Sequence, residues 1–320
     1  MQFYPVRSPP QPLLNEREFP MARPSSDRPS RGPLASRRRF LALSVSALAA
    51  ATATPALLAQ VAGRAEAAPL TIEDIKKRGV VRIGVEAAYR PFTFREGSAI
   101  VGYDVDLAKE IFAPLGVKVE MVDTAWAGVI PALYAGNFDV IMTSLTYTKE
   151  RVAKVGYSIP YTEATQELLV RAGDAGTIKD LSGMSGKVLG VKLGSAGDTM
   201  KTGLDEKLKA ATGKGFAQVK TYDDHPAAYL ALAQGSVDGV INTLATLTQV
   251  VKDAPGKYAI VRDIGPRNWA GIGTRKEDED LISFLNQRIT ALKESGELYK
   301  LQEKWFGVRM QLADKVPSFS

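Results

Sequence analysis

The sequence ALYAGNFD at residues 132–139 recurs in altered form as ALAQGSVD at residues 231–238, with an offset of 99 residues. Each copy carries an apolar helical segment, a glycine that suits the end of a helix, and an aspartate before an apolar run. A second matching pair consists of IGVE at residues 83–86 and LGVK at residues 189–192. A repeat of this length is too long for one unit of a solenoid. It predicts two similar lobes, and the alternative is coincidence between two ordinary helix–turn–strand segments.

Short apolar strands alternate with amphipathic helices around both copies. We expect strands over residues 80–86, 117–121, 139–142, 187–191, 216–222 and 237–242. We expect helices over residues 104–112, 128–134, 198–211, 227–234, 279–293 and 296–306. Because this alternation is typical of parallel sheets covered by helices, the sequence predicts the α/β class.

The positive charge of the chain is concentrated near its beginning. The 320 residues carry a formal net charge of +6, and nine Arg against four acidic residues in positions 1–68 contribute +5 of it. The rest is close to neutral, so we expect no basic surface for nucleic acid. The chain has no Cys, and His225 is its single histidine. These counts exclude disulfides and argue against histidine-rich metal sites, so we expect neither a metal nor a cofactor.

Residues 36–67 have the order of regions found in a secretory signal. SRRRFL at residues 36–41 precedes an apolar, alanine-rich run over residues 42–58. AEA at residues 65–67 then has the small-x-small pattern that a signal peptidase cuts. The sequence predicts a leader over residues 1–67 that is cleaved near Ala67 and Ala68, and a periplasmic mature protein.

The paired arginines of this leader stand directly before Phe40 and Leu41. This arrangement resembles the twin-arginine class of signal, which implies export in the folded state. The alternative is an uncleaved membrane anchor. Thr52, Thr54 and Pro55 interrupt the apolar run, and only about 17 residues are available where a span needs about 20. We therefore expect no membrane span after cleavage.

The ends of the expected strands select the candidate ligand-binding residues. In open α/β sheets, ligands bind beyond the carboxyl ends of the strands. In the first lobe that rule selects Glu86, Tyr89, Ser144 and Thr146, and in the second lobe residues 192–197 and Asn242 with Thr243.

The loop of Gly194, Ser195 and Ala196 joins a strand to a helix. Glycine lets the backbone approach a ligand, and the free N–H groups at a helix N-terminus favour a carboxylate. The spacing is not that of a nucleotide-binding P-loop, because the Gly-Lys-Ser/Thr element is absent.

The stretch GYDVDLA at residues 102–108 resembles the signature of the family 3 bacterial extracellular solute-binding proteins, which serve polar amino-acid ABC importers. Further stretches that resemble the family are WAGVIPAL (126–133), GNFDVI (136–141), TKER (148–151), YSIPY (157–161), LYKL (298–301) and KWFG (304–307). The resemblance therefore covers nearly all of the chain after the leader.

This resemblance implies a periplasmic-binding-protein fold of type II. Each lobe would be a small, mostly parallel sheet flanked by helices, and two crossover strands would join the lobes. Residues 68–165 and 267–320 would form lobe 1, and residues 166–266 lobe 2. The function implied is capture of a small zwitterion between the lobes by a monomer that delivers it to a membrane permease.

The resemblance also implies roles for individual residues. Arg151 matches the residue that pairs with the α-carboxylate of the ligand, and a guanidinium offers two parallel donors to such a group. Ser144 and Thr146 match hydroxyl contacts of the family. Tyr89 and Trp126 match aromatic walls that enclose the side chain or a cationic group of the ligand.

Two positions depart from the pattern of the family. Thr243 stands where an Asp commonly holds the α-ammonium of the ligand, and Ala196 stands where a hydroxyl residue is usual. Glu86 matches a frequently acidic position and could compensate for the missing Asp. A modified zwitterion, such as an opine or an ectoine-like compound, or a simple carboxylate is the alternative ligand.

Two other functions compete with that of a binding module. An enzyme resembling cyclohexadienyl dehydratases would need an acid–base pair, for which Glu86 and Lys192 are the candidates. A receptor ectodomain is disfavoured because no apolar span follows Phe306 and Gly307. His225, beside Pro226 at the expected start of a helix, is interpreted as a capping or solvated residue.

Overall fold

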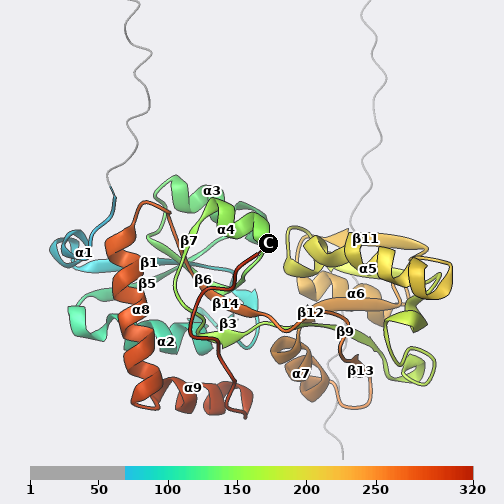
Figure 1. Ribbon diagram of the computed structural model, residues 1–320. Helices are drawn as coiled ribbons and strands as arrows, with labels where there is room; N and C mark the ends of the chain where they lie inside the picture. Colours follow the sequence, from blue (N-terminus) through green and yellow to red (C-terminus); the bar gives the residue numbers. More distant parts are fainter. Residues whose placement is uncertain (1–68, 320) are drawn as a thin grey trace, which may run out of the picture. The chain divides into compact units, whose positions relative to one another are not determined.

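A computed structural model describes residues 69–319. The predicted leader and its cleavage site lie outside these residues. Two larger sheets and one small sheet form the described part of the chain (Figure 1). We call the larger sheets, with the helices that cover them, lobe 1 and lobe 2.

The sheet of lobe 1 includes one strand from late in the sequence, β14, which lies between two strands from the earlier part of the chain. Its order is β5-β1-β6-β14-β7, and β8 also pairs with β14. The bounds are β1 Val80–Val85, β5 Lys118–Asp123, β6 Val140–Thr146, β7 Gly156–Tyr157, β8 Thr162–Glu163 and β14 Trp269–Thr274. The strand β1 runs parallel to β5 and β6, whereas β14 runs antiparallel to β6, β7 and β8.

The sheet of lobe 2 has the order β11-β10-β12-β9-β13. Its strands are β9 Gln166–Arg171, β10 Val188–Lys192, β11 Gln218–Tyr222, β12 Gly239–Thr243 and β13 Tyr258–Val261. The pairs of β10 with β11 and β12 are parallel, and those of β9 with β12 and β13 are antiparallel. Both sheets are therefore mixed, and the short antiparallel strands were not predicted from the sequence.

Nine α-helices surround these sheets within residues 69–319. They are α1 Ile72–Arg78, α2 Tyr103–Phe112, α3 Val129–Tyr134, α4 Lys149–Lys154, α5 Ala196–Thr212, α6 His225–Ala233, α7 Leu244–Asp253, α8 Glu279–Glu294 and α9 Glu297–Phe306. The small sheet consists of β2 Ala88–Tyr89, β3 Thr93–Glu96 and β4 Ala99–Val101. Among the helices of residues 69–319, none is long and apolar enough to cross a membrane.

Helices cover both faces of each large sheet. Side chains of β6 alternate between two clusters, so that Val140 and Met142 pack with α2 and α8 while Ile141 and Leu145 pack with α3. In lobe 2, α5 packs on one face of the sheet, and α6 and α7 pack on the other. Burial of both faces explains why β6 begins with the continuous apolar run of residues 140–142.

The internal repeat is confirmed by the pairing register. Ile83 pairs with Val140 in lobe 1, and Leu189 pairs with Gly239 in lobe 2, at the matching positions of the two repeats. The repeated aspartates also act alike: Asp139 accepts a hydrogen bond from the N–H of Arg82 at 2.7 Å, and Asp238 from that of Val188 at 2.9 Å. Each carboxylate thus fixes the start of the neighbouring parallel strand.

Candidate functional site

A small cavity, with an accessible volume of about 20 Å³, lies where side chains of lobe 1 meet side chains of lobe 2. We call it the central cavity. Its lining residues come from the ends of strands and the starts of helices, and they are Tyr89, Trp126, Thr143, Ser144, Thr146, Arg151, Gln166, Lys192, Ser195, Ala196, His225 and Asn242.

Arg151 is a buried cation that faces this cavity. Its side chain projects from the short helix α4, whose first turn is capped by the hydroxyl of Thr148. The guanidinium donates to the carbonyl oxygens of Thr146 at 2.9 Å and Gly194 at 2.7 Å. Its neighbour Glu150 pairs with Lys154, and no carboxylate of residues 69–319 forms an ion pair with Arg151.

Burial lowers the pKa of the Arg151 guanidinium, because desolvation disfavours the charged form. An arginine nevertheless stays protonated in proteins. A buried cation whose guanidinium donates hydrogen bonds only to carbonyl oxygens, with no ion-pair partner among the described residues, is therefore well suited to receive an anion.

Ser144 presents an unpaired hydroxyl to the same cavity. Its backbone lies in the left-handed region at φ +50°, an uncommon conformation for a residue other than glycine. The N–H of Ser144 donates to Asp104 Oδ2 at 3.1 Å and to the Tyr161 hydroxyl at 3.0 Å, which holds this conformation. Its Oγ is buried and has no hydrogen-bond partner among the described residues. Such strain and an open polar atom are typical of a binding site.

The helix α5 begins at the cavity wall. Ser195 is its N-cap, and its hydroxyl accepts a hydrogen bond from the N–H of Asp198 at 3.1 Å. Ser195 and Ala196 both line the cavity, so the N-terminal end of this 17-residue helix is exposed to it. The positive end of the helix dipole adds to the positive charge of Arg151.

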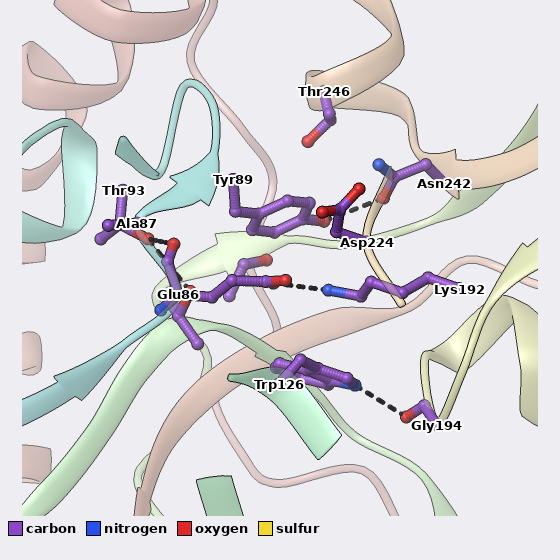
Figure 2. Close-up of polar contacts among 12 residues, drawn as sticks. Glu86, Ala87, Tyr89, Thr93, Trp126, Lys192, Gly194, Asp224, Asn242 and Thr246 are labelled. Carbon is purple, nitrogen blue, oxygen red and sulfur yellow. Dashed lines mark hydrogen bonds and ion pairs between the residues drawn. The ribbon is translucent and has the colours of Figure 1, made fainter. Parts of the chain in front are cut away.

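Glu86 and Lys192 meet between the lobes. Glu86 follows β1, Lys192 ends β10, and their Oε2 and Nζ atoms are 2.5 Å apart. Figure 2 shows this pair between the ring of Tyr89 on one side and that of Trp126 on the other. Lys192 Nζ lies 4.4 Å from the ring centroid of Trp126 and 5.2 Å from that of Tyr89. Desolvation lowers the pKa of Lys192, and the charge of Glu86 opposes this effect.

Tyr89 is held by polar contacts to lobe 2. Its hydroxyl donates to Asn242 Oδ1 at 3.0 Å and lies 3.1 Å from Thr243 Oγ1. Its burial raises the pKa of the phenol to about 12, so the hydroxyl stays protonated. The ring stacks on His225 with a centroid distance of 5.6 Å. Thr243 itself does not line the cavity, and it contacts the cavity-lining Tyr89 through the two hydroxyl groups.

His225 was interpreted as a capping or solvated residue, and this was wrong. It is 5% exposed and lines the cavity, and its neighbour Asp224 caps helix α6 instead. Desolvation, with a smaller effect of the Lys192 charge, lowers the pKa of His225 well below its usual value. The imidazole is therefore neutral in the fold.

Trp126 connects the cavity to a wider groove. Its indole N–H donates to the carbonyl oxygen of Gly194 at 3.0 Å (Figure 2), and its ring lies 4.8 Å from the guanidinium of Arg151. Trp126, Arg151 and Gly194 also line this second groove, which is open to solvent. The carbonyl oxygen of Gly194 thus accepts hydrogen bonds from both the Trp126 indole and the Arg151 guanidinium.

Most of the residues selected from the sequence surround the central cavity. Seven of them line it, namely Tyr89, Trp126, Ser144, Thr146, Arg151, Ser195 and Ala196. The other three, Glu86, Gly194 and Thr243, contact side chains that line it. The strand-end rule also selected Lys192 and Asn242, which both line the cavity, whereas Thr143, Gln166 and His225 were missed as lining residues. Among residues 69–319, no group of three or more acidic or histidine side chains is arranged to hold a metal ion.

Comparison with known proteins finds one matching protein family and curated relatives that are similar to this chain. The family model for bacterial extracellular solute-binding proteins, family 3, matches residues 81–308. The L-cystine-binding protein TcyJ of Escherichia coli strain K12 is 32% identical over 237 residues, which cover 74% of this chain and 86% of the relative.

Solved structures agree with these relatives. An ancestral arginine-binding protein bound to arginine is 37% identical to this chain. The match covers 72% of this chain and 99% of the chain of that structure, with a TM-score of 0.64. An ancestral amino acid-binding protein described as a precursor of cyclohexadienyl dehydratase is 31% identical, covers 73% of this chain and 98% of its own, and has a TM-score of 0.64. The predicted two-lobed α/β fold is thereby confirmed.

Proposed function

Because this chain belongs to the bacterial extracellular solute-binding proteins of family 3, we propose that it is the amino-acid-binding component of an ABC transporter. The named relatives that carry this similarity bind cystine, arginine or amino acids in general, and none of them is named as an enzyme. The ligand would bind in the central cavity, where both lobes contribute side chains. Delivery to a membrane permease would follow.

The observation that carries this proposal is the unpaired charge of Arg151. Its guanidinium is buried, faces the cavity and is bonded only to two carbonyl oxygens within the described residues. A ligand carboxylate would supply the missing anion and form charge-assisted hydrogen bonds. The N-terminal end of α5 and the unpaired Ser144 hydroxyl would add further polar contacts.

The α-ammonium of the ligand would meet neutral acceptors in this site. The position where the family commonly has an Asp is Thr243, and the nearby carboxylate of Glu86 is engaged by Lys192. The candidates to hold the ammonium are the Ser144 hydroxyl and the side-chain oxygen of Gln166, since both residues line the cavity.

A thermal-shift and calorimetric screen of the full-length protein against the standard amino acids and L-cystine tests the proposal. A true ligand at about 100 times its dissociation constant stabilises the fold by about 2.7 kcal/mol. Opines, ectoine and simple carboxylates belong in the same screen, because they are the alternative ligands. If only these compounds stabilise the protein, the amino-acid assignment is wrong.

Arg151→Met should weaken binding of the ligand identified in this way by at least about 100-fold, because a charge-assisted contact is lost in a buried site. Arg95→Met is the matched control, since Arg95 is exposed and pairs with Asp123 away from the cavity. Isothermal titration of both variants measures the effect. Equal affinity of the Arg151 variant and the control would remove Arg151 from the carboxylate site.

We also propose that residues 1–67 are a twin-arginine leader and that the mature, monomeric protein of residues 68–320 works in the periplasm. The proposal rests on the arginine pair, the apolar run and the AEA pattern in the sequence. The intact mass of the protein recovered from the periplasm should match a chain that begins at Ala68. Replacing Arg38 and Arg39 with Lys should prevent export, and continued export of that variant would exclude this type of signal.

A further inference from the structure

We propose that Lys192 is a built-in cation that fills the aromatic side-chain subsite of the cavity and restricts the ligand to amino acids without a cationic side chain. This inference rests on the proposed function, because it concerns the ligand of the same site. It assigns to Lys192 a role in specificity.

The surroundings of the Lys192 ammonium form a complete site for a cation. The ammonium lies 4.4 Å from the ring centroid of Trp126 and 5.2 Å from that of Tyr89, which is within the range of cation–π attraction. Its third neighbour is the carboxylate of Glu86 at 2.5 Å (Figure 2). Two aromatic rings and one carboxylate are the groups that would hold a guanidinium or ammonium of a ligand. In this chain, lobe 1 supplies these three groups and lobe 2 supplies the cation.

Lys192 is not a surface residue that enters the cavity by chance. Lys192 is 2% exposed and stands at the end of β10, which lies between β11 and β12 in the sheet. Burial of a lone ammonium is unfavourable, so its position is stabilised by Glu86 and the rings. The Lys192 side chain therefore occupies this subsite as part of the fold.

The charges of the cavity disfavour a second cation. Arg151 and Lys192 are both positive, and the one carboxylate at the aromatic subsite, Glu86, is already paired. Asp224 lies on the lobe 2 side of this subsite in Figure 2, but its carboxylate accepts from the N–H of Ala227 to cap α6. A guanidinium or ammonium on the ligand side chain would find the subsite filled and would be repelled by Lys192.

The Lys192 ammonium can instead donate hydrogen bonds to an uncharged or acidic side chain of the ligand. An ammonium has three N–H donors, and the structure pairs one of them with Glu86. Because Lys192 lines the cavity, its other donors are available to a carbonyl or carboxylate oxygen of the ligand. The expected ligand class is therefore amino acids with neutral or acidic side chains.

The test compares four proteins: wild type, Lys192→Ala, Lys192→Met and the double variant Lys192→Ala with Glu86→Gln. Lys192→Ala vacates the space between the rings and leaves Glu86 free to pair with a ligand cation. Lys192→Met removes the charge but keeps the space filled. The double variant vacates the space and also removes the anion. Each full-length protein is titrated with L-arginine, L-lysine, L-glutamine, L-glutamate and L-cystine.

We expect Lys192→Ala to bind L-arginine at least about 100-fold more tightly than wild type, since the ligand would gain a carboxylate partner and two aromatic faces. Lys192→Met and the double variant should show no comparable gain. Lys209→Met is the control, because Lys209 is exposed on α5 and pairs with Asp205. If Lys192→Ala is unstable, L-arginine should raise its melting temperature while L-glutamine should not.

Wild type that binds L-arginine as tightly as neutral amino acids would overturn the inference. So would a Lys192→Ala variant that keeps its wild-type ligand and gains no affinity for L-arginine. Either result leaves the proposed function intact. If none of the four proteins binds any amino acid, the proposed function is overturned and the inference with it.

Discussion

Asp104 links the most recognisable stretch of the sequence to the cavity. It lies in the GYDVDLA stretch, is fully buried, and its Oδ2 accepts the hydrogen bond that holds Ser144 at a positive φ. Its other oxygen, Oδ1, has no hydrogen-bond partner in the described part of the chain. Desolvation raises the pKa of this carboxyl to about 7 from an ordinary value of 3.8.

This raised pKa predicts a pH-dependent stability. The folded state holds the Asp104 proton up to about pH 7, whereas the unfolded chain releases it near pH 4. The folded state therefore binds more protons in that window, and its stability falls as the pH rises from about 4 to about 7.

Urea unfolding at pH 5 and pH 8 should show wild type losing about 2–3 kcal/mol more than Asp104→Asn over this interval, at about 1.4 kcal/mol per pKa unit. The asparagine side chain can still accept the hydrogen bond from Ser144, so the variant is expected to fold. Parallel changes in stability for the two proteins would show that Asp104 ionises normally in the fold.

At the scale of elements, the two copies of the repeat end their helices in the same way. Gly136 after α3 and Gly235 after α6 have φ values of +77° and +76°, and a Cβ at either position would meet no atom within 4 Å. The constraint on both is therefore the backbone conformation and not a lack of space. A left-handed conformation costs residues other than glycine about 1–2 kcal/mol.

Gly136→Ala and Gly235→Ala should each destabilise the protein by about 1 kcal/mol, and by similar amounts. Gly203 provides the control, because it lies inside helix α5, is exposed and also has free space around it. Gly203→Ala should stabilise the protein by up to about 1 kcal/mol, since alanine is the better helix former. Thermal denaturation of the three variants measures these changes in stability. If Gly203→Ala destabilised the protein as the other two substitutions do, the explanation would be contradicted.

The parallel half of each sheet was predictable from the sequence, but the antiparallel half was not. The strands β1, β5, β6, β10, β11 and β12 are apolar runs that alternate with helices, and all six were expected. The strands β7 and β8 have two residues each, which is too short for a periodic pattern. The strands β9 and β14 give a pattern that is no stronger than that of neighbouring loops, and their pairing depends on contacts far apart in sequence.

The strand-end rule found the site because parallel strands bring their carboxyl ends to one edge. It could not show that Lys192 is buried, because a lysine at a strand end is ordinarily exposed. The sequence holds no signal for the side chains that bury it, since Glu86, Tyr89 and Trp126 are 66–106 residues away along the chain. His225 was missed for the same reason: its burial depends on stacking with Tyr89 and Tyr229.

At the scale of the whole molecule, the two lobes differ in how the chain builds them. The sheet of lobe 2 uses only strands between Gln166 and Val261, which is one continuous segment. The sheet of lobe 1 places β14, residues 269–274, between β6 and β7. Helices α8 and α9 from the same late segment complete its core with Leu281, Leu285 and Leu298.

A chain that ends after Pro266 should therefore keep lobe 2 and lose lobe 1. Hydrogen exchange measured by mass spectrometry should show protected amides in β10 and β12 and rapid exchange in β1 and β5. The missing segment supplies a strand inside the lobe 1 sheet and apolar side chains of its core, so the remaining residues cannot bury enough surface. Protection of β1 in the truncated chain would show that lobe 1 folds without its final segment.

The late position of β14 also sets the order in which the protein can form during its synthesis. A ribosome adds residues one after another at about 5–20 per second, and segments fold as they become complete. Lobe 2 has all its strands once Val261 has emerged, whereas lobe 1, whose first strand is made long before, must wait for residues 269–274. The nascent chain thus carries β6 without its partner β14 while residues 147–268 are added, and the lobe whose first strand is made earliest is the lobe that is completed last.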